Sequence, residues 1–263
     1  MKVCADLHVH SCRSSDGRMT VEEIFDRVRA AGLNGVAIAD HNSVDGTREA
    51  LDKAPEDLVI FPAAEMSTDR GHMLCYFVKE PPERFGIEKQ GNVYLFEDIR
   101  RYVKIQGGLI FAAHMYRHGP ADRDVIPLTD GIEIFNGRET ARRQQANDAS
   151  AELVREFGVP FTAGSDAHLP GDVGSAYKIM ELPEKPTESD LRAALLAKHG
   201  TYYGRYLSLT PQGLDGMRRA LRDGKPKRFL RNAAKAAVGA VYDPTRALRR
   251  ASRDIAGGRT YEV

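Results

Sequence analysis

The chain has 263 residues, of which 29% are charged, a length and composition that suit one large hydrophobic core with an appendage. No apolar run approaches the roughly eighteen residues that cross a bilayer, and the N-terminus lacks a signal peptide's layout, so we expect a cytoplasmic protein without a membrane span. The three cysteines, Cys4, Cys12 and Cys75, are odd in number and lack a CxxC spacing, which argues against a disulfide framework.

Charge is spread unevenly along the chain. Residues 1–204 hold 24 Lys and Arg against 32 Asp and Glu, whereas residues 205–263 hold 14 against 5. Such a change predicts a boundary between a slightly acidic body, residues 1–204, and a basic, mostly helical C-terminal extension, residues 205–263.

The first predicted strand, residues 2–5, runs into Asp6-Leu7-His8-Val9-His10. Side chains alternate along a strand, so His8 and His10 point to the same side and are close enough to hold one metal ion. Two histidines at this spacing are common on exposed strands without any metal. The interpretation therefore depends on the rest of the chain.

A strand and helix alternation follows. A capping box at Thr20 and Glu23 predicts a helix that Gly32 ends. Further helices are predicted near residues 44–53, 95–106 and 139–157, and strands near residues 35–39, 58–64, 72–78, 109–113, 131–135, 159–163 and 177–180. This rhythm predicts a parallel sheet, and about seven units predict its closure into a barrel.

Histidines and carboxylates follow most of these strands, at the end of a barrel that lines an active site. They are Asp40-His41-Asn42, Glu65, His72, His114, and the Asp166 and His168 of Gly164-Ser165-Asp166-Ala167-His168. Neutral imidazoles and carboxylates are the ligands of divalent metals that activate water, and a carboxylate can bridge two ions.

The order of these motifs, with Ser15-Asp16-Gly17 after the first, resembles the polymerase and histidinol phosphatase (PHP) family over residues 1–204. The resemblance implies a distorted seven-stranded (β/α)7 TIM-like barrel that hydrolyses phosphoesters with two or three divalent metal ions. It implies three ligand sets: His8, His10, Glu65 and Asp166; Glu65, His72 and His114; and Asp16, His41 and His168. Sites rich in imidazole favour Zn, Mn or Fe over Mg.

Asp16 stands where some family members have His, which resembles the branch that acts on nucleotide and short RNA phosphates. That branch often carries an inserted domain between the positions of His72 and His114, where this chain has only 41 residues. We therefore expect a small phosphorylated substrate: a metabolite, a nucleotide or a short oligonucleotide.

Cationic and polar side chains at strand ends are candidates to bind the phosphate. The resemblance supports Arg117 and Asn136, and Arg138 less strongly. His168 is also a candidate to protonate the leaving oxygen, but one imidazole cannot readily do this and bind metal, so we assign it to metal.

Four other side chains each allow two interpretations. Asp6 and Asp40 either orient imidazoles or make strand-end hydrogen bonds. His118 faces the pocket or lies on an exposed loop. His199 lies before Gly200 at the end of a predicted helix, where a cation interacts favourably with the helix dipole, so a structural role accounts for it.

Two rival functions stay open. A metal amidohydrolase also opens its barrel with His-x-His, but commonly bridges its metals with a modified lysine, and here Glu65 takes that place. A non-catalytic, metal-stabilised module would bind nucleic acid or a partner, yet no ligand is missing. The basic stripe of Arg228, Arg231 and Lys235 suits nucleic acid or a membrane surface, although packing against the barrel is the simpler interpretation.

Overall fold

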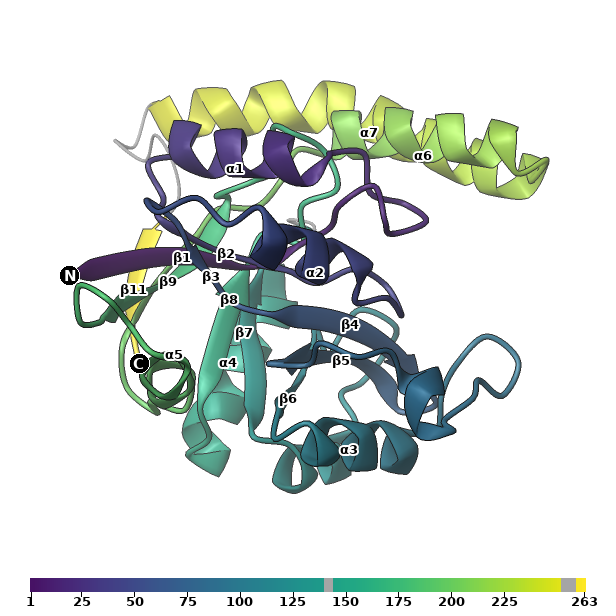
Figure 1. Cartoon of the computed structure of the whole chain (residues 1–263). Helices are drawn as coiled ribbons and strands as arrows, with labels where there is room; N and C mark the ends of the chain where they lie inside the picture. The colour runs from purple at the N-terminus through teal and green to yellow at the C-terminus, as the bar shows by residue number, and fades with distance from the viewer. Residues whose placement is uncertain (140–143, 252–258) are drawn as a thin grey trace.

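The computed structural model describes residues 1–139, 144–251 and 259–263 (Figure 1). Its centre is a curled sheet in which nine strands follow the order β3-β2-β1-β9-β8-β7-β6-β5-β4, with β10 and β11 attached beside β9. The strands are β1 (Lys2–Val9), β2 (Gly35–Ile38), β3 (Val59–Ile60), β4 (Ala63–Thr68), β5 (Gly71–Tyr76), β6 (Leu109–Ala112), β7 (Gly131–Asn136), β8 (Phe161–Gly164), β9 (Ala176–Glu181), β10 (Thr201–Gly204) and β11 (Arg259–Glu262). The helices are α1 (Val21–Ala30), α2 (Asp45–Asp52), α3 (Phe96–Ile105), α4 (Gln144–Phe157), α5 (Glu188–Leu195), α6 (Leu209–Arg222) and α7 (Pro226–Ala251).

The ends of this sheet approach each other next to the predicted site. His41, just after β2, forms a β-bridge with Glu65 on β4, and the Asn42 N–H donates to the Glu65 carbonyl at 2.8 Å. The predicted α/β fold with a barrel-like sheet is therefore confirmed.

The number and direction of the strands differ from the prediction. Four neighbouring pairs, from β1 to β3 and from β6 to β8, are parallel, but β4, β5 and β9 pair with their neighbours antiparallel. Only Asp69 and Arg70 separate β4 from β5, and a connection of two residues can join only antiparallel strands.

Helix α1 begins and ends as predicted. Thr20 Oγ1 accepts from the Glu23 N–H at 3.2 Å, and the Glu23 carboxylate accepts from the Thr20 N–H at 2.8 Å. Ile24 and Val28 are buried against β1 and β2. Gly32 has a φ of 72°, which ends the helix in a conformation that glycine adopts without strain.

A β-bulge in β1 directs its histidines toward the barrel interior. Leu7 packs in the inner hydrophobic cluster with Phe61 and Phe111, whereas Val9 packs in the cluster beneath α1. Strict alternation of side chains would place Leu7 and Val9 on the same face of the strand. The register shift between Asp6 and Val9 instead places them on opposite faces. His8 and His10 are therefore fully buried above the inner cluster.

The C-terminal extension forms a hairpin of two long helices along one side of the molecule, at the top of Figure 1. Three glycines let α6 and α7 approach closely. A Cβ on Gly213 would lie 2.5 Å from the Ala236 nitrogen, and one on Gly239 would lie 2.4 Å from the Thr210 nitrogen. A Cβ on Gly216 would lie 2.4 Å from Asn232 Oδ1.

Ion pairs attach α6 to the loop that follows β1. Arg219 lies 3.1 Å from Asp16, and Arg18 lies 3.0 Å from Asp215. Farther along, β11 pairs with β10, which returns the chain end to the sheet. The division into two domains at residue 204 stays a prediction.

Helix α7 continues through Pro244, although Asp243 and Pro244 predict the start of a separate third helix in the extension, residues 243–255, with Asp243 as its N-cap. Proline in a helix removes one backbone donor without always ending the helix. Residues 252–255 of the predicted third helix lie outside the described residues. Within the described chain, no helix is both long and apolar enough to cross a bilayer.

Lys178, on β9, is buried without an acidic partner in the described chain. Its ammonium group donates to the carbonyls of Phe161 at 2.9 Å and Ala194 at 3.0 Å, and lies 4.4 Å from the centre of the Phe161 ring. Burial lowers the pKa of Lys178 to about 7.

This lysine predicts a pH-dependent stability. Between about pH 7 and pH 10.5 the unfolded chain binds a proton at Lys178 that the folded chain has released, so the free energy of unfolding rises with pH, by at most about 1.4 kcal/mol per pH unit. Lys178→Met lacks this contribution. Urea unfolding at pH 7 and at pH 9 gives the free energy of unfolding of both proteins. The wild-type value minus the variant value should rise by about 2 kcal/mol from pH 7 to pH 9. An unchanged difference would show that Lys178 titrates normally.

Candidate metal centre

Five imidazoles surround the buried carboxylate of Glu65. Oε1 lies 2.8 Å from His72 Nδ1 and 2.8 Å from His114 Nε2. Oε2 lies 3.3 Å from His8 Nε2, 3.4 Å from His10 Nε2 and 3.0 Å from His41 Nδ1. Burial alone would raise the pKa of this carboxyl, but the attraction of His41, His8 and His72 holds it well below its usual range. Both oxygens are thus presented as anionic donors.

The first predicted ligand set converges at one point. His8 Nε2 and His10 Nε2 lie 3.1 Å apart, and Asp166 Oδ1 lies 3.2 Å from His10 and 3.9 Å from His8. Ligand atoms at about 2.0–2.2 Å from a shared ion are separated by about 2.8–3.6 Å. The separations between these donors and Glu65 Oε2 are close to that range.

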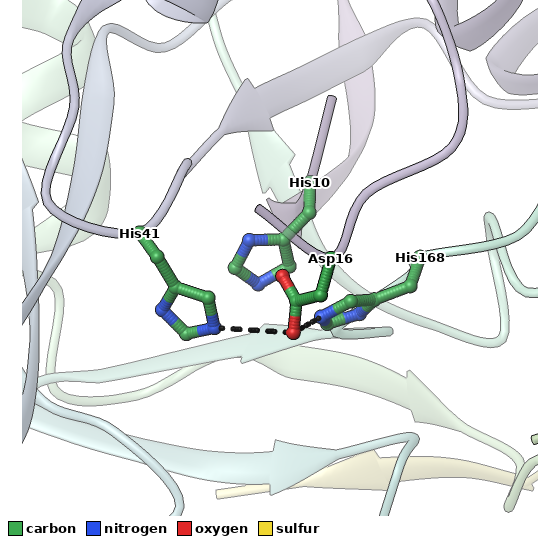
Figure 2. Close-up of side chains that lie close together, drawn as sticks. All are labelled: His10, Asp16, His41 and His168. Atoms are coloured by element: carbon green, nitrogen blue, oxygen red, sulfur yellow. Dashed lines mark ion pairs between the residues drawn. The ribbon is translucent and has the colours of Figure 1, made fainter. Parts of the chain in front are cut away.

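The third predicted set, Asp16, His41 and His168, gathers around His10 (Figure 2). Asp16 Oδ2 lies 3.0 Å from His168 Nε2 and 3.7 Å from His41 Nε2. His168 Nδ1 lies 2.8 Å from the carbonyl of Asp166, so a proton on Nδ1 would direct the Nε2 lone pair toward Asp16.

The second predicted set differs slightly from the geometry. Glu65, His72 and His114 are in contact, but the group whose donors lie within 4.8 Å of one another contains His41 in place of His114. The two nitrogens of His41 face Glu65 and Asp16, so this ring joins the second set to the third. All nine predicted ligands therefore form one continuous cluster.

The donor chemistry fits divalent metal ions. Glu65 Oε2, His41 Nδ1 and His10 Nδ1 are buried and make no well-aligned hydrogen bond within the described chain. Burial, reinforced by nearby positive charge, lowers the pKa of His10 and of His114 to about 3, so both rings are neutral, as metal ligands must be. Burial alone would also lower the pKa of His41, but Glu65 and Asp16 raise it to about 9, so this ring would release a proton when it binds a metal ion. Buried acceptors without a well-aligned hydrogen bond, beside neutral imidazoles, indicate a place for a cation.

Glu133, on β7, supports the cluster from behind. Its Oε1 lies 2.8 Å from His8 Nδ1, and its Oε2 accepts from the His114 N–H at 2.9 Å and from Asn136 Nδ2 at 3.0 Å. Sequence analysis did not select this residue. The available signal was a single charged residue inside the apolar run of residues 131–135.

Asp6 and Asp40 brace the backbone rather than contact the rings. Asp6 accepts from the Ser165 N–H and the Gly174 N–H, each at 2.9 Å. Asp40 accepts from the N–H of Ser11 at 2.7 Å and from its hydroxyl at 2.6 Å. Burial raises the pKa of both carboxyls to about 6.

Arg117 lies at the edge of the cluster with its guanidinium in a fixed position. It donates to Asp166 Oδ2 at 2.6 Å, to Asn136 Oδ1 at 2.9 Å and to Glu139 Oε1 at 3.0 Å. Asn136 Nδ2 also lies 3.3 Å from Asp166 Oδ2. Arg117 and Asn136 thus orient Asp166, a role in addition to the predicted phosphate contact.

The other candidates separate into near and remote positions. His118 approaches the cluster, since its ring centre lies 6.1 Å from that of His72, and with Arg138 it lines an adjacent cavity. His199 is exposed beside β10, away from the cluster.

The backbone is strained at the site. Three of the four non-glycine residues with positive φ in the described chain are here: His114 at 26°, Asp166 at 54° and Asn42 at 53°. Left-handed backbone at such residues costs about 1–3 kcal/mol and is concentrated at functional sites. Here it turns two candidate ligands inward at the ends of β6 and β8.

Comparison with known proteins is consistent with this geometry. Residues 6–105 match the PHP domain family, and residues 144–199 match a PHP-associated family. An uncharacterised protein of Methanocaldococcus jannaschii is 29% identical over 200 residues, which cover 72% of this chain and 75% of that protein.

Two solved structures share the fold. One is a two-domain protein of Bacteroides vulgatus containing a predicted PHP-like metal-dependent phosphoesterase, with a TM-score of 0.62 at 16% identity; the match covers 78% of this chain and 65% of that one. The other is an amidohydrolase of Chromobacterium violaceum, with a TM-score of 0.55 at 20% identity, covering 74% and 98%.

Because Glu133 supports His8, its replacement should weaken metal binding without abolishing it. Glu133→Gln keeps the shape but removes the charge facing His8, so affinity for Zn²⁺ or Mn²⁺ should fall about 10- to 100-fold. Equilibrium dialysis with metal analysis measures this fall. Glu97→Gln, on the exposed face of α3, is the matched control. Equal affinities in all three proteins would contradict the role of Glu133.

Proposed function

The chain belongs to the PHP family, and on that premise we propose that it hydrolyses a phosphoester bond of a small phosphorylated molecule with the help of two or three divalent metal ions. The observation that carries this proposal is the environment of Glu65. One buried carboxylate with imidazoles on both oxygens is the arrangement that a bridging ligand needs.

The three ligand sets would each hold one ion. The first comprises His8, His10, Glu65 and Asp166, the second Glu65, His72 and His114, and the third Asp16, His41 and His168. His41 is also within reach of the second set. Bound Zn, Mn or Fe would polarise the phosphoryl oxygens and lower the pKa of water to near neutrality.

Side chains around the cluster bind and orient the substrate. The Arg117 guanidinium, held beside Asp166, neutralises negative charge that builds on the phosphoryl oxygens in the transition state. Asn136 contacts both Arg117 and Asp166 and holds the two side chains in position. His168 faces Asp16 through Nε2, and burial together with Arg138 lowers its pKa, so it serves as a neutral ligand rather than a proton donor.

Both rival functions make different demands on the chain. An amidohydrolase with a modified bridging lysine would need a lysine at the cluster, and the buried lysine of β9, Lys178, instead donates to backbone carbonyls. A non-catalytic module would have no need for strained ligands beside an arginine. These observations favour hydrolysis of phosphoesters.

The test is hydrolysis by protein reconstituted with Mn²⁺ or Zn²⁺. p-Nitrophenyl phosphate and bis-p-nitrophenyl phosphate report monoesterase and diesterase activity. His10→Ala and Asp166→Ala each remove a ligand and should lower the rate roughly a hundredfold or more, and a chelator should do the same. His199→Ala, an exposed histidine away from the cluster, should keep the wild-type rate.

Two results would count against the proposal. Equal rates in wild type and both ligand variants would trace the hydrolysis to a contaminant. Metal-loaded wild type that is inactive on both phosphate esters but cleaves an amide substrate would favour the amidohydrolase.

A further inference from the structure

A cavity of about 600 Å³ lies between the candidate metal centre and the C-terminal helices. Arg117 and Arg138 line it from the barrel, and Leu209, Arg231 and Lys235 line it from α6 and α7. Its volume is that of a small-molecule site. Arg117 also contacts Asp166, so the cavity opens directly beside the cluster.

The lining of this cavity is strongly positive. Four of the described lining side chains are Arg or Lys. Glu139 is the one carboxylate among the described lining residues, and it already accepts from Arg117. Like charges held near one another repel, and this repulsion is relieved when an anion binds between them.

The contacts of Lys235 and Arg138 leave part of this charge without an acidic partner within the described chain. Lys235 Nζ donates to the neutral Gln212 Oε1 at 2.6 Å. Burial, together with Arg138, Arg117 and Arg219, lowers the pKa of Lys235 to about 8. Arg138 Nη1 is buried and has no hydrogen-bond partner within the described chain. A buried donor of this kind needs an acceptor.

The wall that carries Arg231 and Lys235 is fixed to the barrel. These residues are one helical turn apart on α7, which packs closely on α6 through Gly213 and Gly216. Arg219 of α6 in turn pairs with Asp16 of the cluster. The hairpin lies outside both segments that match the PHP families.

Resting on the proposed function, we propose that Arg231 and Lys235 form a subsite for a second anionic group of the substrate. The phosphoryl group to be cleaved lies at the cluster beside Arg117, and a carboxylate or a further phosphate of the same molecule lies against α7. The substrate class is a phosphorylated small molecule with a second negative charge.

Binding of non-hydrolysable phosphonates tests this subsite independently of turnover. Isothermal titration calorimetry on the full-length, Mn²⁺-loaded protein compares carboxyalkyl phosphonates with two to four methylene groups against alkyl phosphonates of the same length. In wild type, at least one carboxylate member should bind about 10- to 100-fold tighter than its partner. Arg231→Ala and Lys235→Gln should each remove most of that preference and leave alkyl phosphonate affinity within about twofold.

Lys227→Ala is the matched control, since it removes one exposed positive charge from the same helix outside the cavity. It should keep the wild-type preference. The subsite is refuted if wild type shows no preference at any length, or if Lys227→Ala lowers the preference as much as the cavity variants do. If wild type keeps the preference but hydrolyses no phosphoester, the proposed function is rejected and the subsite is kept. If wild type hydrolyses phosphoesters but shows no preference, the subsite is rejected and the proposed function is kept.

Discussion

The structure depends on the burial of the Glu65 carboxylate. An ionised carboxylate removed from water costs several kcal/mol unless charges or hydrogen bonds compensate it, and here five imidazoles supply that compensation. Those rings come from β1 and the residue after it, from β5, and from the segments after β2 and β6. The sheet must therefore curl until these elements face one another. The bridge between His41 and Glu65 lies where the two ends of the curled sheet meet.

Local signals in the sequence predicted the parts of the fold that local chemistry determines. The Thr20 and Glu23 capping box places α1. Apolar runs place the carboxyl ends of β1, β2, β6 and β8, after which candidate ligands follow. The nine candidate ligands came from the order of these motifs, and the structure gathers all of them. Most of these ligands lie in a strand or within a few residues of its end, which is why sequence analysis could find them. Asp16, in the loop between β1 and α1, came only from the family resemblance.

Features that depend on contacts between distant segments could not be predicted. The antiparallel β9 and the bulge in β1 depend on which strands become neighbours. The role of Glu133 is visible only when His8 and His114 are placed beside it. Arg231 and Lys235 looked like one stripe on a helix, and only the packing of α7 on α6 turns them toward a cavity.

The pairing of β1 with β9 has a consequence for the way the chain folds during synthesis. Lys2 lies opposite Glu181, so one side of β1 has no strand partner until β9 has left the ribosome. Pairing between such distant segments is slow, and an unpaired strand edge is open to association with other chains. A nascent chain that ends before residue 176 would also hold every candidate ligand without the strand that completes the sheet around them. The last ligand, His168, is thus synthesised before the strand that fixes the ligand cluster in space.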